Sequence, residues 1–337
     1  MREPEAVKVS VVIATYGREQ VLCDTVRQVL AQTYPDFEVI VVDQTERHEP
    51  ETVRFLEEVG DRVRLVKLDR PSVTVAENEG IRRARGEVVL FLDDDVRIAP
   101  GLIAAHVRNY RDRRWAGVGG LVIEAGRPPS RHLPRVVTNS DAGWFFFMHN
   151  YDRRTEVRVA QGCNMSFRRR VLVEVGGVDE GFLENAVHWE LDLCNRISQA
   201  GGGIVHDPEA HVLHLKHPVG GCRMGRTKAQ SFFDNYMRVI FRHLGRHQRP
   251  LVLWRLLRDY VLVDGQLDPV AVTRMCWRMG RALVRALCRG TAEPVLGLAD
   301  ERRGPSAQPG PCEGGSGEWL RKWRQREVLR DGEAICA

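Results

Sequence analysis

Four short apolar segments separated by amphipathic stretches shape the first third of the chain. They span residues 9–14, 37–42, 63–68 and 88–92. Their Val, Ile, Leu and Phe residues mostly follow one another without polar alternation, which is typical of strands buried on both faces. Amphipathic patterns, with apolar side chains every three or four positions, lie at residues 19–31, 51–59 and 73–84. This alternation predicts an α/β fold with a mostly parallel, Rossmann-like sheet that helices cover on both faces.

Polar side chains gather where three of these predicted strands end. They are Thr15, Tyr16 and Arg18 after the first strand, Asp43 and Gln44 after the second, and Asp93, Asp94 and Asp95 after the fourth. The carboxyl ends of parallel strands meet along one edge of a sheet, where α/β proteins bind their ligands. The three strand ends therefore predict one shared binding site.

The three consecutive aspartates indicate a cation at this edge. Adjacent carboxylates repel one another, and burying them is costly unless something positive neutralises them. A D-x-D arrangement suits a hard divalent ion that bridges a carboxylate and the oxygens of a nucleoside diphosphate. Capping of a helix that starts near Pro100 is the alternative, but it requires fewer acids. We therefore expect a hard divalent ion, Mn²⁺ or Mg²⁺, at this group of aspartates.

Composition narrows the class of protein. A net charge of +5 over 337 residues is mild, so no nucleic-acid partner is expected. The eight cysteines form no C-x-x-C pair and, without a secretion signal, are typical of reduced thiols in a cytosolic protein. The N-terminal apolar run is too short for a signal peptide, and no segment reaches 18 uninterrupted apolar residues. We expect a cytoplasmic protein, or one attached peripherally to the inner face of the cell membrane.

The chain resembles the family 2 glycosyltransferases, which have the GT-A fold. The matching segments, in the family's order, are VSVVIATYGR, QTYPDFEVIVVDQT, ARGEVVLFLDDDV, GCNMSFRR, VGGVDEGF, HWELDLCNRISQAGG and DPEAHVLHLKHPVGGCR. They cover about two thirds of the chain, from Val7 to Arg223. The resemblance implies inverting transfer of a sugar from a nucleotide-diphosphate donor to a hydroxyl of a glycan or lipid-linked acceptor. It also implies a role in bacterial-type polysaccharide or glycoconjugate synthesis.

The resemblance assigns donor-binding roles residue by residue. The implied nucleotide-sugar pocket comprises Thr15, Tyr16, Arg18, Asp43, Gln44, Asn78, Asp93 and Asp94. In it, Asp93 would contact the ribose, and Asp43 the base and ribose. Gln44 replaces the family's usual second acid, which leaves the base open, with uridine or thymidine as the default. Glu77 stands where Arg is common, which affects how the diphosphate is approached.

The family's metal site and lid also have counterparts here. His214 matches the histidine that completes the metal shell beside Asp95, and Asn164 matches an acceptor-side position. In the basic loop that follows, Lys216 and Arg223 could cover the diphosphate, or the loop could simply be exposed. A zinc site is the alternative for the histidine cluster, but its spacing fits no standard zinc motif. The cluster comprises His206, His211, His214 and His217.

Inverting transfer requires a base that removes the proton of the acceptor hydroxyl. The family carries it in an acidic pair before D-L-x-x-R, which corresponds here to a helix expected over residues 189–200. Counting back from Arg196, Glu190 occupies the base position and Trp189 replaces the preceding acid. A position in the first helical turn favours the ionised form that a base needs. The alternative is that Asp192 is the base and Glu190 only a first-turn acid.

The chain divides into three predicted parts. A catalytic domain spans 1–245, with a nucleotide-binding half over 1–123 and an acceptor-side half and lid over 124–245, which includes a short strand over 212–215. A basic amphipathic extension spans 246–300, and a flexible linker with a short C-terminal helix spans 301–337. The basic residues of the extension recur at helical spacing, at Arg274, Arg278, Arg281, Arg285 and Arg289. An anionic membrane surface or packing on the catalytic domain would each explain this helix.

Three other functions remain to be compared. A nicotinamide-dependent dehydrogenase should carry G-x-G-x-x-G after the first strand, where Ala14-Thr15-Tyr16-Gly17-Arg18 stands instead. A sugar nucleotidyltransferase would share the sheet and the metal, but should have a glycine-rich first loop. A non-catalytic nucleotide-sugar-binding or membrane-associated protein is the third alternative, and the presence of Asp93, Asp95, Glu190 and His214 together argues against it.

Overall fold

The computed structural model describes residues 7–124, 150–221, 230–258, 269–289 and 298. Within these residues one sheet has the strand order β3-β2-β1-β4-β8-β6-β9-β5, and β7 pairs with β9 beside this path. The strands are β1 (Val9–Thr15), β2 (Phe37–Asp43), β3 (Val63–Lys67), β4 (Val88–Asp93), β5 (Val96–Ile98), β6 (Trp115–Glu124), β7 (Thr155–Val157), β8 (Asn164–Arg168) and β9 (Gly203–His214). The helices are α1 (Gln20–Leu30), α2 (Pro50–Glu58), α3 (Val73–Arg83), α4 (Leu102–Val107), α5 (Arg169–Glu174), α6 (Trp189–Gln199), α7 (Gln230–His243), α8 (Arg249–Leu256) and α9 (Pro269–Arg289), with a 3₁₀ turn η1 (Arg108–Arg111).

The four strands predicted in the first third of the chain are confirmed as β1 to β4. The three helices predicted between them are α1, α2 and α3. β1 pairs in parallel with both β2 and β4, and β2 pairs in parallel with β3. In this register Thr15 lies beside Asp43, and Ala14 lies beside Asp93. The polar strand ends therefore meet at one edge, as the sequence predicts.

The second half of the sheet is mixed rather than parallel. β8 runs antiparallel to β4 and β6, and β9 runs antiparallel to β5 and β7. β9 pairs in parallel only with β6 among the described strands. The sheet is thus parallel over β3, β2, β1 and β4, and it is mixed beyond β4. The observed class is α/β, with helices on both faces.

The sequence pattern misses β6 because three of its ten residues are glycines, which weaken a strand signal. Close packing explains two of them. A Cβ at Gly120 would lie 2.1 Å from the carbonyl oxygen of Ala210, and one at Gly117 would lie 2.4 Å from the Phe167 ring. β9 is also longer than the predicted strand 212–215, because its first part pairs with β6 before a register shift near Gly120.

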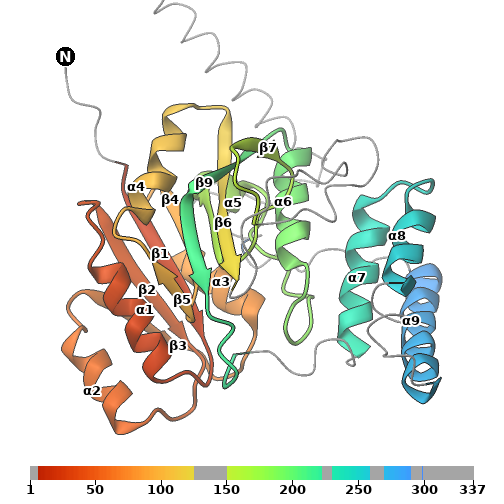
Figure 1. The fold of residues 1–337 in the computed structure, drawn as a ribbon, viewed down its shortest axis with the longest axis horizontal. Coiled ribbons are helices and arrows are strands. Elements are labelled where there is room, and N and C mark those ends of the chain that lie inside the picture. The colour runs from red at the N-terminus through yellow and green to blue at the C-terminus, as the bar shows by residue number, and fades with distance from the viewer. Residues whose placement is uncertain (1–6, 125–149, 222–229, 259–268, 290–297, 299–337) are drawn as a thin grey trace, which may run out of the picture.

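Two hydrophobic cores cover the two faces of the sheet. Alternate residues of each strand point to opposite faces, so Val12 and Phe91 enter one core while Ile13 and Leu90 enter the other. Residues of α3, α5, α6 and α7 complete the first core, and residues of α1 and α4 complete the second. Figure 1 shows α1 and α2 on the left of the molecule and α6 on the other side of the sheet, between the sheet and α7. This two-faced burial holds the strand ends rigidly in place.

The C-terminal helices form a group beside the sheet domain (Figure 1). α7 packs against both α6 and α9, and Met275, Met279 and Ala282 of α9 are buried in the same core as the sheet. The predicted C-terminal helices are therefore present, and α9 packs against α7. No helix in the described parts of the chain is long and apolar enough to cross a bilayer. The predicted linker and helix over 301–337 lie outside the described residues.

Candidate active site

A cavity of about 710 Å³ opens at the carboxyl edge of the sheet, where β1, β2 and β4 end. The predicted site residues that line it are Thr15, Tyr16, Arg18, Gln44, Asp93, Asp94, Asp95, Trp189, Glu190 and His214. The predicted residues that do not line it are Asp43, Asn78, Asn164, Asp192 and Lys216. Arg223 lies outside the described residues. One cavity thus combines the predicted donor, metal and base positions.

A buried arginine neutralises the crowded aspartates from within the protein. Arg18 is 2% exposed, its Nη2 lies 3.1 Å from Asp95 Oδ2, and its Nε lies 3.3 Å from Asp94 Oδ1. Arg18 Nη1 also donates to the carbonyl oxygens of His217, at 3.0 Å, and Val219. Arg18 therefore ties the loop after β9 to the acidic strand end. Sequence reasoning missed this pairing, because it expected only a bound metal to offset the charge.

The Asp94 side chain binds other residues of the protein, namely Thr15 and Arg18. Its Oδ2 accepts a hydrogen bond from the Thr15 hydroxyl at 2.7 Å, and its side chain lies beside Arg18. Burial raises the pKa of Asp94 to about 7, although Arg18 and Thr15 act in the opposite direction. The Asp94 carbonyl also accepts from the Thr25 hydroxyl at 2.9 Å. These bonds fix the turn after β4 to β1 and α1, which holds Asp93 and Asp95 in position.

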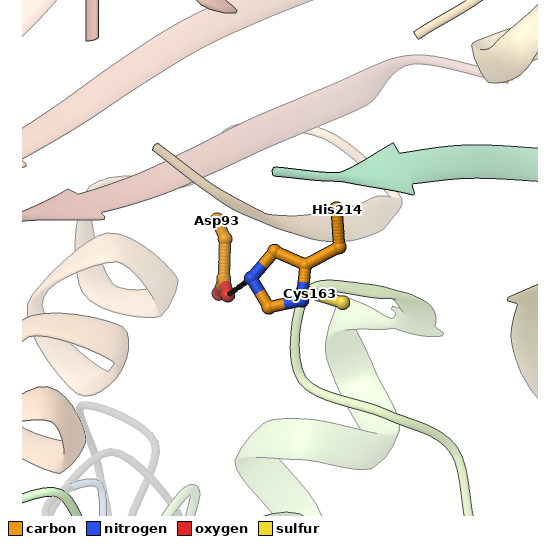
Figure 2. A group of neighbouring side chains, drawn as sticks. All are labelled: Asp93, Cys163 and His214. Atoms are coloured by element: carbon orange, nitrogen blue, oxygen red, sulfur yellow. Dashed lines mark ion pairs between the residues drawn. The ribbon is translucent and has the colours of Figure 1, made fainter. Parts of the chain in front are cut away.

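Asp93, Cys163 and His214 form a group whose ligand atoms all lie within 4.8 Å of one another (Figure 2). His214 Nε2 lies 3.4 Å from Asp93 Oδ2 and 3.2 Å from Asp95 Oδ1. Burial raises the pKa of the Cys163 thiol well above its usual value, with Asp93 and Asp95 adding to the effect. The group therefore offers carboxylate oxygens, one imidazole and a single buried thiol as possible ligands. This set fits a hard divalent ion such as Mn²⁺ better than a thiolate zinc site.

The other histidines of the cluster lie elsewhere. His206 is buried and its Nε2 lies 2.6 Å from the Tyr151 carbonyl oxygen, while His211 is exposed. His217 lies in the loop that Arg18 binds, and its backbone N–H donates to Asp95 Oδ2 at 2.8 Å. Of these four histidines, His214 is the one that lines the cavity. β9 brings it there through its pairing with β5, in which His214 lies opposite Val96.

Asp43 lies behind the cavity wall rather than in it. Its Oδ2 accepts from Lys67 Nζ at 2.8 Å and lies 3.0 Å from His48 Nε2, and its Oδ1 accepts from the Thr45 N–H at 2.9 Å. Burial alone would raise the pKa of Asp43, but Lys67, Thr45 and His48 together lower it. In this state Asp43 organises the loop after β2, which differs from the expected contact with the base.

Gln44 lines the cavity, whereas Asn78 lies outside it. The Oε1 of Gln44 accepts from the backbone N–H of Ser72, the N-cap of α3, at 2.5 Å. Asn78 is fully buried, and its side chain makes two hydrogen bonds with the backbone of Val178, at 2.8 and 2.9 Å. Asn78 therefore anchors α3 to the rest of the protein instead of contacting the cavity.

Glu190 enters the cavity from the first turn of α6. The preceding residues Glu184, Ala186 and His188 all have positive φ angles, of 54°, 47° and 69°. Such strain in non-glycine residues clusters at functional sites. Trp189 is buried and its ring lies edge-on to Phe91, at 6.3 Å between centroids. This packing fixes the start of α6, and with it the direction of Glu190.

Aromatic residues of α7 close the cavity on the side of α6, and sequence reasoning missed them. Phe232 and Tyr236 line it, and the Tyr236 ring lies edge-on to the His188 ring at 4.1 Å between centroids. The apolar repeat of the segment QSFFDNYMRVIFRH was the available signal, since it predicts an amphipathic helix with an aromatic face.

Asp192, the alternative base, is fully buried in an ion network away from the cavity. Its Oδ2 accepts from Arg196 Nε at 2.8 Å, and its Oδ1 lies 2.7 Å from Arg242 Nη1 and 2.8 Å from His243 Nε2. Burial would raise the pKa of Asp192, but Arg196, His243 and Arg242 together hold it far below its usual value. Asp192 joins α6 to α7, so its geometry is that of a structural residue.

Asn164 and Lys216 differ from their expected positions. Asn164 is fully buried, its Nδ2 donates to the carbonyl oxygens of Leu121 at 3.1 Å and Ala210 at 2.9 Å, and its Oδ1 lies 2.9 Å from His106 Nε2. Its amide crosslinks β6, β8 and β9 instead of facing an acceptor. Lys216 has a positive φ of 50° and pairs with Glu124 at 2.7 Å. Lys216 therefore does not cover the cavity in this state.

Comparison with known proteins places these residues in a family. Residues 10–176 match the model described as glycosyl transferase family 2. The glucosyl-dolichyl phosphate glucuronosyltransferase of Haloferax volcanii is 32% identical over 225 residues, which cover 61% of this chain and 69% of that protein. The chain belongs to glycosyl transferase family 2. This is a family of inverting transferases.

Other matches to the family 2 chain differ more in length or sequence. The O-antigen biosynthesis protein RfbC of Myxococcus xanthus is 30% identical over 223 residues, which cover 61% of this chain but 17% of that protein. The mannosyltransferase PcManGT of Pyrobaculum calidifontis, solved with GDP-Man and Mn²⁺, superposes with a TM-score of 0.53. It is 18% identical, and the match covers 99% of this chain and 90% of that one. This likeness shows that the family 2 chain has a GT-A-like fold.

Proposed function

We propose that this family 2 chain transfers a sugar, with inversion, from a nucleotide-diphosphate donor to an acceptor hydroxyl in polysaccharide or glycoconjugate synthesis. The observation that carries the proposal is one cavity that Asp93, Asp95, His214 and Glu190 all line. A metal-binding acidic edge and an acidic side chain on a separate helix are the two groups that such a transfer needs. Relatives named for glucuronosyl transfer and O-antigen synthesis support this class of reaction.

The donor would occupy the part of the cavity that β1, β2, β4 and α3 enclose. Thr15, Tyr16 and Gln44 line the nucleotide end, and Asp93, Asp95 and His214 lie at the diphosphate end. These last three residues would hold a divalent ion, which supplies positive charge to the diphosphate leaving group. Arg18 lies directly beside them and holds the adjoining loop. The PcManGT neighbour, solved with GDP-Man and Mn²⁺, supports a metal-bound donor here.

Glu190 would act on the acceptor side as the general base. The acceptor hydroxyl must approach the anomeric carbon from the side opposite the leaving diphosphate, because the family inverts the configuration. Glu190 lines the cavity from the first turn of α6, whereas Asp93 lines it from the end of β4. It would take the hydroxyl proton as the oxygen attacks. The buried Trp189 and the strained segment before it would hold the carboxylate in position.

The proposed donor site predicts that a nucleoside diphosphate binds in a metal-dependent way, and that this binding requires Asp93 and Asp95. We expect Asp93→Asn and Asp95→Asn each to weaken Mn²⁺-dependent binding of a nucleoside diphosphate by at least ~10-fold, since each removes one anionic ligand. Calorimetric titration of UDP, dTDP and GDP, with and without Mn²⁺, measures this. Asp24→Asn on the exposed face of α1 is the matched control. Undiminished metal-stimulated binding by both site variants would remove the metal assignment.

We also propose that the acceptor is lipid-linked and that α9 meets an anionic membrane surface. The outward side of α9 exposes Val270, Trp277, Val284 and Leu287, each by more than half. The Arg281 guanidinium lies over the Trp277 ring at 4.5 Å from its centroid. Apolar and cationic side chains on one helix face suit the interface of anionic lipid. The H. volcanii relative, named for a dolichyl phosphate substrate, supports a lipid-linked acceptor.

The full chain should therefore sediment with vesicles that contain anionic lipid and should dissociate as salt rises, because the attraction is screened. Trp277→Ala combined with Arg281→Gln should lower the bound fraction at least ~5-fold at low salt, since both insertion and about one charge are lost. Arg54→Gln, on the exposed side of α2, is the control. Equal sedimentation with purely zwitterionic vesicles would contradict the role of anionic lipid, and no sedimentation at any salt would leave α9 as a packed helix only.

A further inference from the structure

The segment that leads into α6 holds three non-glycine residues in the left-handed region of backbone conformation. They are Glu184, Ala186 and His188, with φ angles of 54°, 47° and 69°. This conformation is costly for residues with a Cβ atom, so it persists where surrounding contacts fix it. The Ala186 N–H donates to the Leu183 carbonyl oxygen and the Trp189 N–H to that of Ala186, each at 2.9 Å. These bonds form the turn, and contacts with other elements have to hold it in place.

Asn235 of α7 makes two such contacts. It is 1% exposed, its Oδ1 accepts a hydrogen bond from the Leu183 N–H at 3.1 Å, and its Nδ2 donates to the Leu183 carbonyl oxygen at 3.0 Å. One amide therefore pairs with both backbone groups of the residue directly before the strained turn. Because the donor and the acceptor belong to one planar group, the two bonds together fix the position and the direction of the chain at Leu183.

Two further residues of α7 contact the strained residues themselves. The Ser231 hydroxyl donates to the Glu184 carboxylate, and the Tyr236 ring lies edge-on to the His188 ring at 4.1 Å between centroids. α7 thus holds the first and the last strained residue as well as the residue before them. Glu190 follows His188 by two positions and lies in the first turn of α6. The place of this turn therefore sets where the Glu190 carboxylate enters the cavity.

Two arginines fix α7 itself against both ends of this region. Arg238 Nε and Arg242 Nη1 each lie 2.8 Å from Asp179 Oδ2, and Arg242 Nη1 also lies 2.7 Å from Asp192 Oδ1 on α6. The polar side chains of α7 that make these contacts recur every three or four positions, at Ser231, Asn235, Arg238 and Arg242. Residues at this spacing share one face of a helix. One face of α7 therefore binds residues 179–192 along their length.

We propose that Asn235 is a positioning residue: it holds residues 183–188 so that Glu190 enters the cavity in the orientation in which it can take a proton. This inference rests on the proposed function, because Glu190 is the proposed base. α7 begins after Arg223, where the resemblance to the family ends, and lies outside residues 10–176, which the family model matches. The role therefore follows from the contacts of α7 in this chain. Misplacing a reacting group by about 1 Å can cost roughly 100-fold in rate, so the effect should be measurable.

The first test measures turnover with Mn²⁺ and UDP-, dTDP- and GDP-sugars, with water in place of the acceptor. Asn235→Ala should lower the release of nucleoside diphosphate at least ~10-fold, because Glu190 loses its fixed position. The affinity for the nucleoside diphosphate itself should stay within about twofold, since the residues around it are unchanged. Asn109→Ala is the control, because Asn109 is also buried, lies outside the cavity and donates to Asp207 at 2.7 Å. Equal losses of turnover in both variants, or unchanged turnover in Asn235→Ala, would overturn the inference.

Hydrogen exchange tests the placement of the turn without any turnover. In Asn235→Ala the backbone amides of Ala186 and Trp189 should exchange at least ~10-fold faster, because the turn that they close is released. In Asn109→Ala they should exchange as in the wild-type chain. Unchanged exchange at both amides in Asn235→Ala would contradict the inference.

Ser231→Ala keeps the test decisive if Asn235→Ala does not fold. It removes one hydrogen bond to the same turn, so it should lower turnover and speed exchange at Ala186 and Trp189 by about 2–10-fold. No change in either quantity would overturn the inference. If the wild-type chain releases no nucleoside diphosphate from any donor, the proposed function fails instead, and the exchange rates still show whether α7 holds the turn.

Discussion

Glu190→Gln should bind the donor and the metal normally and transfer sugar about 10²–10⁴-fold more slowly, which is the usual contribution of a positioned general base. The substitution keeps the size of the side chain and its place in the cavity but removes the proton acceptor. Glu190 lies in the first turn of α6, where the helix dipole favours the carboxylate that a base must be. The loss should appear in turnover rather than in donor affinity, which initial-rate kinetics and titration measure separately.

The matched comparison is Asp192→Asn, two residues along the same helix. If Asp192→Asn, still folded, abolishes transfer while Glu190→Gln is nearly active, the base has been assigned two residues too early. The structure gives a reason to expect the opposite, because Asp192 is fully buried and does not line the cavity. Glu190→Asp serves as a second control, since it keeps the carboxylate with a shorter reach and should retain part of the activity.

Asp192→Asn should instead destabilise the fold by about 3–5 kcal/mol, the cost of removing one partner from a buried ion network. The substitution would leave Arg196, Arg242 and His243 without the carboxylate that now joins α6 to α7. The midpoint of urea unfolding at pH 7 measures this loss. Asp112→Asn is the control, because that acid pairs with Arg114 at the surface, where a pair is worth at most about 1 kcal/mol.

The same carboxylate predicts how stability depends on pH. The folded-state pKa of Asp192 lies below its unfolded value, because the effects of Arg196, His243 and Arg242 together outweigh that of burial. Its stabilisation is therefore complete above the unfolded pKa of about 4 and declines as the pH falls toward the depressed folded value. The difference in stability between the native chain and Asp192→Asn should narrow below about pH 4. A difference that stays constant down to acid unfolding would contradict this role.

The sequence predicted those strands and helices that have a regular apolar pattern and a clear polar residue at their end. The strands that end at Thr15, Asp43 and Asp93 were predictable because each is a nearly continuous apolar run that stops at polar residues. Their convergence followed from parallel pairing, which brings their ends to one edge. The second half of the sheet was less predictable. Two glycines of β6, Gly117 and Gly120, are needed because Phe167 and Ala210 pack closely against them, and the sequence does not show this packing.

Side-chain roles were predictable only where they depend on position along a strand or helix. The sequence placed Glu190 and His214 at the site, and the cavity contains both. It could not show that Asp43 is bound by Lys67 and His48, or that Asn164 crosslinks three strands. These pairings join residues that tertiary packing brings together, and a residue type that suits a ligand also suits a buried partner.

The most direct test of the central claim is a product measurement on the full chain with a panel of UDP-, dTDP- and GDP-sugars and Mn²⁺ or Mg²⁺. The account predicts metal-dependent release of the nucleoside diphosphate from one class of donor, slow into water and faster with an acceptor, and lost in Asp93→Asn. Release of a nucleoside monophosphate or of pyrophosphate would indicate nucleotidyl chemistry instead. No release of nucleoside diphosphate from any donor, with either metal and a folded chain, would contradict the account.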